Sequence, residues 1–227
     1  MNDAEYRTDK NDAEYRVAVR RSMLALIGRK IGMTQLFNDE GMRIPVSVIK
    51  VEPNVVVRER TKEKHGYSAM VLGADTLKKS RVKKPYGGQF PQGVDPKRFL
   101  LEFKDFEKEC AVGEALGVEI FEGVRYVDVR GTTKGKGFQG VVRRHKFAGG
   151  PGAHGSKFHR EMGSVGTGAF RKIVKGSKMP GRMGNERLTV QNMRLFRVDK
   201  EKGLLLINGA VPGRRGGMVV VLKASKK

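Results

Sequence analysis

A glycine triplet with the spacing of a dinucleotide-binding fingerprint stands in the middle of this 227-residue chain. Gly135-x-Gly137-x-x-Gly140 is followed about 20 residues on by Glu161, the outline of a turn that holds a pyrophosphate and an acid that holds a ribose. That chemistry requires a helix after the last glycine, whereas a glycine–proline run occupies 148–152. The chain also lacks a G-x-x-x-x-G-K-[ST] phosphate loop. A nucleotide-binding enzyme is therefore the weaker alternative.

Histidines and the one cysteine are the next candidates for chemistry. His154 and His159 lie on a glycine-rich stretch, without an H-E-x-x-H motif or the carboxylates of a metal site. We expect both to hydrogen-bond phosphate or ribose, or to stack on a base. Cys110 is the only cysteine, which excludes an internal disulfide framework and a thiolate zinc site and indicates a reducing, cytoplasmic compartment. Nothing positions a nucleophile, so the sequence predicts neither an enzyme nor a bound metal or cofactor.

Cations outnumber every other ionisable group. The chain has 46 Lys and Arg against 24 Asp and Glu, a formal net charge of +22. Residues 130–187 hold 14 basic and two acidic side chains, net +12, together with 14 of the 30 glycines. Residues 1–22 are net 0, 23–129 are net +3 and 188–227 are net +7. Such an excess opposes compact folding by self-repulsion unless a polyanion neutralises it.

The composition of 130–187 predicts recognition of a nucleic-acid backbone. Glycines let the main chain approach phosphates, lysines supply point charges and arginines supply bidentate forks. Phe138, Phe147 and Phe158 stand between the cations and can stack on bases. A solvated basic loop is the alternative, but ordinary loops do not lack acids to this degree. The absence of a helix-turn-helix or zinc-finger pattern favours RNA over DNA. No stretch approaches the roughly 18 apolar residues of a membrane span, and we expect no membrane partner or small-molecule substrate.

Short β-strands must position this segment. Apolar runs bounded by turn residues predict strands at 44–51, 55–57, 67–72, 117–129, 188–198, 204–207 and 218–222, a hairpin turn at 199–203 and an irregular excursion at 83–97. The fold class is therefore mainly β, with a small closed or partly closed barrel. Residues 130–187 show neither helical nor strand periodicity and interrupt the strands. They predict a long irregular basic extension that is either disordered or ordered by its partner.

The expected organisation has three parts. Residues 23–129 and 188–227 form a globular β-barrel domain, and 130–187 form the extension inserted into it. Residues 1–22 contain a duplicated Asn-Asp-Ala-Glu-Tyr-Arg and predict a flexible, solvated tail. Met23 directly follows that tail and is a candidate natural start.

Five segments resemble the bacterial-type large-subunit ribosomal protein L3 family, in order along the chain. They are IGRKIGMTQLF at 27–37, IPVSVI at 44–49, GTTKGKGFQG at 131–140, KMPGRMGNERLTVQN at 178–192 and GAVPG at 209–213. The resemblance implies a six-stranded barrel on the outside of the large subunit. It also implies an extension that threads through ribosomal RNA towards the peptidyl-transferase centre, with 145–165 nearest its tip. It further implies a structural protein that joins early in assembly and adjoins other large-subunit proteins.

The charge pattern and the resemblance together identify the expected ribosomal RNA contacts. These are Arg29, Lys30, Lys134, Lys136, Arg143, Arg144, Lys146, His154, Lys157, His159, Arg160, Arg171, Lys172, Lys175, Lys178, Arg182 and Arg187. Two positions depart from the family pattern. No glutamine follows Gly163–Gly166, where some bacterial members carry a methylated one, and His145 stands where many have tryptophan. A non-ribosomal RNA-binding chaperone is the alternative function.

Overall fold

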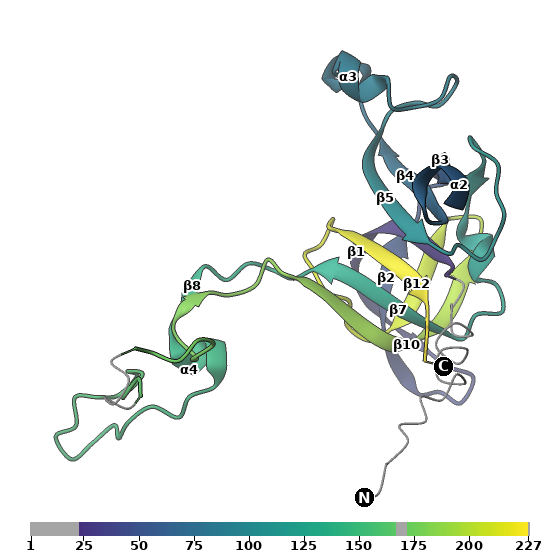
Figure 1. The fold of residues 1–227 in the computed structure, drawn as a ribbon. Helices are drawn as coiled ribbons and strands as arrows, with labels where there is room; N and C mark the ends of the chain where they lie inside the picture. The colour runs from purple at the N-terminus through teal and green to yellow at the C-terminus, as the bar shows by residue number, and fades with distance from the viewer. Residues whose placement is uncertain (1–22, 167–171, 227) are drawn as a thin grey trace, which may run out of the picture. The chain divides into compact units, whose positions relative to one another are not determined.

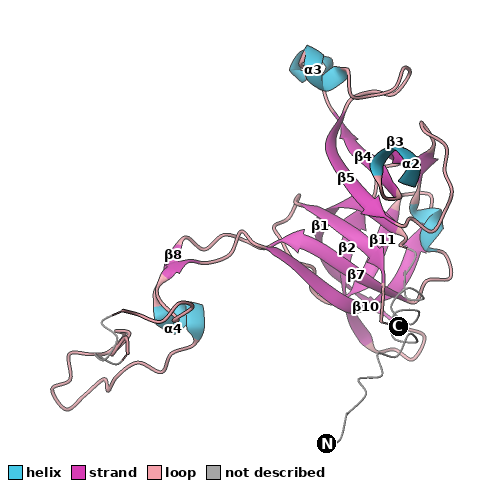
Figure 2. Ribbon diagram, in the orientation of Figure 1, coloured by secondary structure: helices cyan, strands magenta, loops and turns pink. Residues whose placement is uncertain are grey.

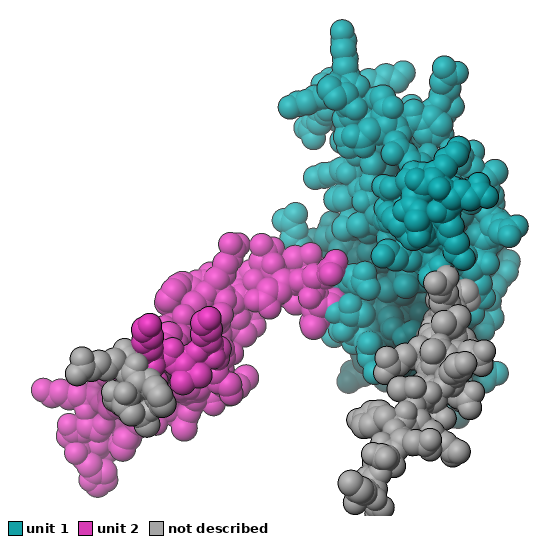
Figure 3. All heavy atoms as spheres, in the orientation of Figure 1, with its two compact units in different colours: residues 1–131, 189–227 teal, residues 132–188 magenta. Residues whose placement is uncertain are grey.

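The computed structural model describes residues 23–166 and 172–226, and it divides the chain into two compact units. Unit 1 comprises residues 1–131 and 189–227, and unit 2 comprises residues 132–188 (Figure 3). The expectations for the 1–22 tail, for Arg171 and for the missing glutamine after Gly166 concern positions outside the described residues.

Unit 1 is built on a closed barrel of six strands (Figure 1). The strands are β1 (Ala25–Phe37), β2 (Arg43–Lys50), β7 (Tyr126–Thr132), β10 (Arg187–Asp199), β11 (Leu204–Asn208) and β12 (Met218–Lys223). Their order around the barrel is β1-β12-β7-β10-β11-β2. The expected mainly-β fold with a small six-stranded barrel is confirmed.

Side-chain alternation explains why these segments form the barrel. In β11, Leu205 and Ile207 are fully buried, whereas the residues beside them are partly exposed, the period of two that a strand with one covered face requires. In β12, by contrast, both faces are buried from Val219 to Leu222. Burial of each such aliphatic side chain stabilises the fold by about 1.5–3 kcal/mol. The barrel is therefore filled and closed by apolar packing.

A separate four-stranded sheet belongs to the same unit. It contains β3 (Asn54–Arg60), β4 (Ala69–Thr76), β5 (Lys97–Lys104) and β6 (Ala115–Leu116), in the order β5-β4-β3-β6. Val56, Leu72 and Phe103 from this sheet share one apolar cluster with residues of the barrel strands. The sequence predicts strands within β3 and β4, but it predicts neither β5 and β6 nor a separate sheet.

In residues 23–166 and 172–226 the helices are few and short (Figure 2). They are α2 (Lys62–His65), α3 (Lys84–Gly87), α4 (Val141–His145) and the 3-10 turns η1 (Lys79–Arg81) and η2 (Val118–Phe121). None in the described part of the chain is long and apolar enough to cross a membrane.

The strand predicted over 117–129 is wrong in its first half. Val118 and Phe121 lie in η2 and are both buried, since a turn of three residues brings positions three apart to the same side. Gly123 then adopts a positive φ of 77°, and the strand begins only at Tyr126. Apolar residues at 118 and 120 mimic strand alternation, which is why the pattern misled.

Candidate nucleic-acid interface

Unit 2 begins as a ribbon of two antiparallel chain segments. Thr133 N–H donates to the Glu186 carbonyl at 2.9 Å, and Glu186 N–H donates back to the Thr133 hydroxyl at 3.2 Å. Further along, Lys136 N–H donates to the Met183 carbonyl at 2.9 Å and Met183 N–H to the Gly137 carbonyl at 3.0 Å. Backbone pairing thus holds this basic segment together, although its sequence shows no strand periodicity.

The ribbon ends in a short ladder between β8 (Phe138–Gln139) and β9 (Gly181–Arg182). Phe138 lies opposite Arg182 and is 75% exposed. A large apolar ring and a guanidinium beside one another on the surface are able to stack on a base and to bind a phosphate.

Glycine at position 184 lets the two segments of the ribbon approach closely. Gly184 has a φ of 74°, and a Cβ there would overlap the Lys134 carbonyl oxygen. Any other residue would both strain the backbone and push the segments apart. The Lys134 side chain stays exposed on the outside of this close contact.

Two adjacent arginines of helix α4, Arg143 and Arg144, differ in exposure and in their hydrogen-bond partners. Arg144 is half-buried and its Nη1 donates to the Met179 carbonyl at 2.7 Å, while His145 Nε2 lies 3.0 Å from the same oxygen. Arg143 is exposed, and its Nη1 donates to the Gln139 side-chain oxygen at 3.2 Å. Arg144 therefore ties α4 to the returning chain, and Arg143 is the arginine of this pair that faces solvent.

The loop beyond α4 is ordered by its histidine and glycines. His159 Nδ1 lies 3.1 Å from the Pro151 carbonyl, and the His159 carbonyl accepts from Gly150 N–H at 3.0 Å. Phe158 packs over Gly150 and remains 37% exposed. His159 is thus partly used within the loop, whereas His154 is exposed with a φ of 56°.

The remaining expected contact residues of unit 2 form an exposed cationic surface. None of them takes part in an ion pair, since all six ion pairs among the described residues lie in unit 1. We call these residues the extension cations: Lys134, Lys136, Arg143, Lys146, Lys157, Arg160, Lys172, Lys175, Lys178, Arg182 and Arg187.

Arg29 and Lys30 belong to unit 1 and are engaged there. Arg29 forms an ion pair with Asp75 at 2.8 Å. Lys30 Nζ donates to the Val211 carbonyl at 2.6 Å and to the Gly213 carbonyl at 3.4 Å. Arg29 thus links β1 to β4, Lys30 holds the loop that precedes β12, and neither is one of the extension cations.

Among the described residues, a surface hollow is found on each unit. One, of about 370 Å³ in unit 2, is lined mainly by Phe147, Met162, Val165 and Met179, with Lys178 among its polar groups. Apolar and aromatic walls beside a lysine suit an unstacked base and its phosphate.

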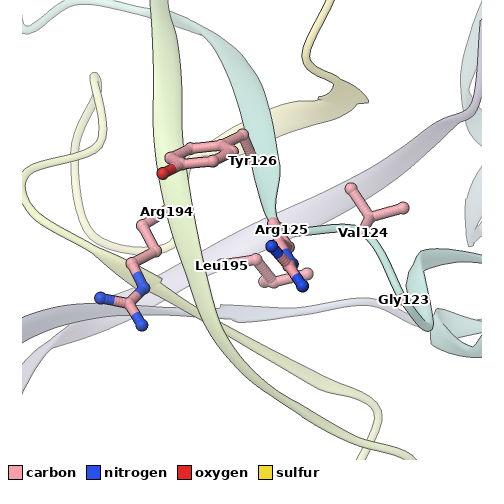
Figure 4. A pocket seen from close by; sticks show the side chains of 6 residues that line it. All are labelled: Gly123, Val124, Arg125, Tyr126, Arg194 and Leu195. Atoms are coloured by element: carbon pink, nitrogen blue, oxygen red, sulfur yellow. The ribbon is translucent and has the colours of Figure 1, made fainter. Parts of the chain in front are cut away.

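The other hollow, of about 630 Å³, lies on unit 1 (Figure 4). Arg125, which directly precedes β7, and Tyr126 at the start of β7 line it together with Arg194 and Leu195 of β10. The sequence does not single out either arginine, because isolated cations resemble ordinary surface residues. Within the described ranges, no group of three or more His, Cys, Asp or Glu is placed to hold a metal ion.

Comparison with known proteins identifies the family of the chain. The family model for Ribosomal protein L3 matches residues 97–204. The large ribosomal subunit protein uL3 of Treponema denticola is 51% identical over 207 residues, which are 90% of this chain and 99% of the relative. The protein of the same name from Borrelia hermsii is 48% identical over 207 residues, with the same shares. That from Treponema pallidum (strain Nichols) is 51% identical over 206 residues, again 90% of this chain and 99% of the relative. Identity at this level along almost the whole of each relative shows that the chain belongs to the ribosomal protein L3 family.

Proposed function

We propose that this protein is a structural constituent of the large ribosomal subunit that binds ribosomal RNA. The observation that carries the proposal is the set of extension cations, exposed on a glycine-rich unit and in no ion pair. The relatives are named as large ribosomal subunit proteins, so the RNA that we propose as the partner is the RNA of the large subunit. The role is structural rather than catalytic, the site of action is the ribosome in the cytoplasm, and neighbouring ribosomal proteins are further partners.

Phosphate neutralisation is the proposed mechanism. Each extension cation that meets a phosphate releases condensed counterions, which favours binding and makes it depend on salt. The ribbon of unit 2 holds Lys134 and Lys136 in fixed positions, so less conformational freedom is lost on binding than in a disordered chain. Unit 1 anchors the protein by its folded barrel.

The position of unit 2 in the subunit is the finer part of the proposal. By its resemblance to the family, the extension reaches towards the peptidyl-transferase centre with residues 145–165 foremost, and the protein joins early in assembly. The exposed Phe158 and His154 lie within that range: Phe158 is suited to stack on a base, and His154 to stack on a base or to hydrogen-bond phosphate or ribose.

The salt dependence of RNA affinity tests the proposal. The slope of log affinity against log salt is negative, and each phosphate contact contributes about 0.7–0.9 to its magnitude. We expect the double variant Lys134→Gln, Lys136→Gln to reduce that magnitude by about 1.4–1.8. The matched control is Lys62→Gln, Lys64→Gln on α2, which removes the same charge from exposed positions of unit 1. The slope is measured by filter binding to in-vitro-transcribed bacterial large-subunit RNA. Equal slopes for the two double variants would contradict the role of unit 2.

Washing large ribosomal subunits with high salt distinguishes a ribosomal protein from an RNA chaperone that acts outside the ribosome. A chaperone binds exposed RNA from outside and is removed from large subunits by high salt. A protein whose extension is embedded in folded RNA sediments with the subunit under the same conditions. Loss of this protein at a salt concentration that retains other large-subunit proteins would favour the chaperone.

A further inference from the structure

The net charge of +3 in residues 23–129 is the sum of a strongly basic segment and a slightly acidic remainder. We call residues 77–98, the connection from β4 to β5 together with the first two residues of β5, the β4–β5 excursion. It holds seven Lys and Arg against one acid, Asp95. The rest of 23–129 holds 11 basic and 14 acidic side chains. A net +6 is therefore concentrated in 22 residues of a body that is otherwise net −3.

Five of these cations are crowded into one short exposed run. They are Lys78, Lys79, Arg81, Lys83 and Lys84, all exposed and in none of the ion pairs of the described residues. The two cations at the base of the excursion differ from them.

Lys97 and Arg98 at the base are engaged by unit 1 itself. Lys97 Nζ donates to the Thr76 hydroxyl at 2.8 Å, and Arg98 lies 3.7 Å from the Asp75 carboxylate. The uncompensated charge is thus confined to the outer run, which Figure 1 shows with α3 beyond the ends of β4 and β5.

The excursion is held in a defined conformation by contacts among its own residues. The Tyr86 and Phe90 rings meet edge to face with centroids 5.4 Å apart, and the Tyr86 hydroxyl donates to the Lys97 carbonyl at 2.6 Å. Leu77 N–H donates to the Pro96 carbonyl at 2.9 Å and closes its base. These contacts hold the cationic run at a defined place, which reduces the ordering cost of binding.

The surface offered by the run is suited to phosphates and poorly suited to a protein. Protein interfaces have an apolar, often aromatic core and are depleted in lysine. Here both aromatic rings are partly buried and packed on each other, and Val82 in the middle of the run is half-buried. What remains outside is almost entirely positive charge.

We propose that the β4–β5 excursion is a second RNA-binding element, which grips the phosphate backbone separately from unit 2. The inference rests on the proposed function, because ribosomal RNA is the polyanion that it would bind. It contacts phosphates without reading sequence, since four of its five cations are lysines, which act as point charges.

Matched double variants of the full chain test the excursion. Lys79→Gln with Arg81→Gln removes two exposed cations that are in none of the ion pairs of the described residues. We expect the salt slope for binding large-subunit RNA to fall by about 1.4–1.8, which makes the loss of affinity between about 50 and 200 mM salt about tenfold smaller than for the unmodified protein. The control is again Lys62→Gln, Lys64→Gln, which should leave the slope unchanged. Equal urea midpoints confirm that all variants are folded.

The unit 2 variant Lys134→Gln, Lys136→Gln, measured in parallel, separates the two proposals. If it lowers the slope while the excursion variant behaves as the control, the excursion faces solvent or an acidic protein and the inference is overturned, while the proposed function stands. If only the excursion variant lowers the slope, the excursion stands and the role of unit 2 fails. A quadruple variant that loses both increments additively shows that the two elements bind independently.

Discussion

The side chain of Asn54 completes the hydrogen bonding of the barrel where β1 lacks a strand on one side. At Ile27, β1 is paired with β12, but its pairing with β2 begins only at Arg29. On the open side, Asn54 Oδ1 accepts from Ile27 N–H at 2.9 Å, and Asn54 Nδ2 donates to the Ile27 carbonyl at 3.0 Å and to the Glu52 carbonyl at 2.8 Å. The amide group is fully buried and supplies the donor and acceptor that a neighbouring strand would supply.

We expect Asn54→Ala to lower the free energy of unfolding by about 2–6 kcal/mol. The change leaves the buried N–H and carbonyl of Ile27 without partners, and each such group costs about 1–3 kcal/mol. That is a large part of the about 5–15 kcal/mol that stabilises a typical domain. Asn54→Asp retains an acceptor but loses both donors and buries a charge, so it should be at least as destabilising.

Urea unfolding of the free protein measures this loss. The chain contains no tryptophan, so the transition is followed by far-ultraviolet circular dichroism. For a denaturant slope of about 2 kcal/mol per M, the midpoint should fall by about 1–3 M. The control is Asn38→Ala, a partly exposed asparagine that accepts a solvent-exposed hydrogen bond from Met42 N–H at 2.7 Å and whose loss should cost under about 1 kcal/mol. An Asn54→Ala midpoint no lower than that of the control, at an unchanged slope, would refute the reasoning.

Three further predictions concern packing, the extension and the thiol. Gly28→Ala should destabilise the protein by about 1–3 kcal/mol in the same urea assay, because the added methyl would lie 2.7 Å from Ile49 Cγ2 in the core. Arg144→Ala should speed amide hydrogen exchange in the segment before β9, which its guanidinium holds; the exposed arginine preceding it, changed in the same way, should not. Burial, and secondly the Glu114 carboxylate, raise the pKa of the Cys110 thiol, so less thiolate is present at pH 8 and iodoacetamide should react more slowly than with a free thiol. Glu114→Gln should lower that pKa and speed alkylation; an unchanged or slower rate would exclude this electrostatic effect.

The barrel could be predicted because its strands carry local signals. The apolar runs of β2, β11 and β12 and the turn at 199–203 are each readable within a window of a few residues. The partition of strands between the barrel and the second sheet could not be read, since it depends on pairings such as Leu26 with Val221, which lie far apart in the sequence. In these segments the local pattern indicates where strands form, whereas long-range packing decides which strands pair.

The candidate site was predictable as a charge but not as a set of contacts. Residues 130–187 stand out in any count of cations, yet the same count cannot separate Arg143, which faces solvent, from Arg144, which donates to a carbonyl. Lys30 is another cation that a carbonyl engages within its own unit. The net charge of residues 23–129 hides the cationic run at 78–84, because acidic residues elsewhere in that range offset its charge. Charge becomes informative only when it is counted over short windows and checked for partners.

The place of β12 in the barrel has a consequence for synthesis of the protein. Without β12 the strands β1-β2-β11-β10-β7 form an open sheet, whose two edges are β1 and β7. β12 is the last strand in the sequence and pairs with both of those edges. Chains emerge from their amino ends, so every other barrel strand and the whole of unit 2 are made before Met218. A chain released early would keep two unpaired edges that can join to another chain, and only completion of the final strand removes both at once.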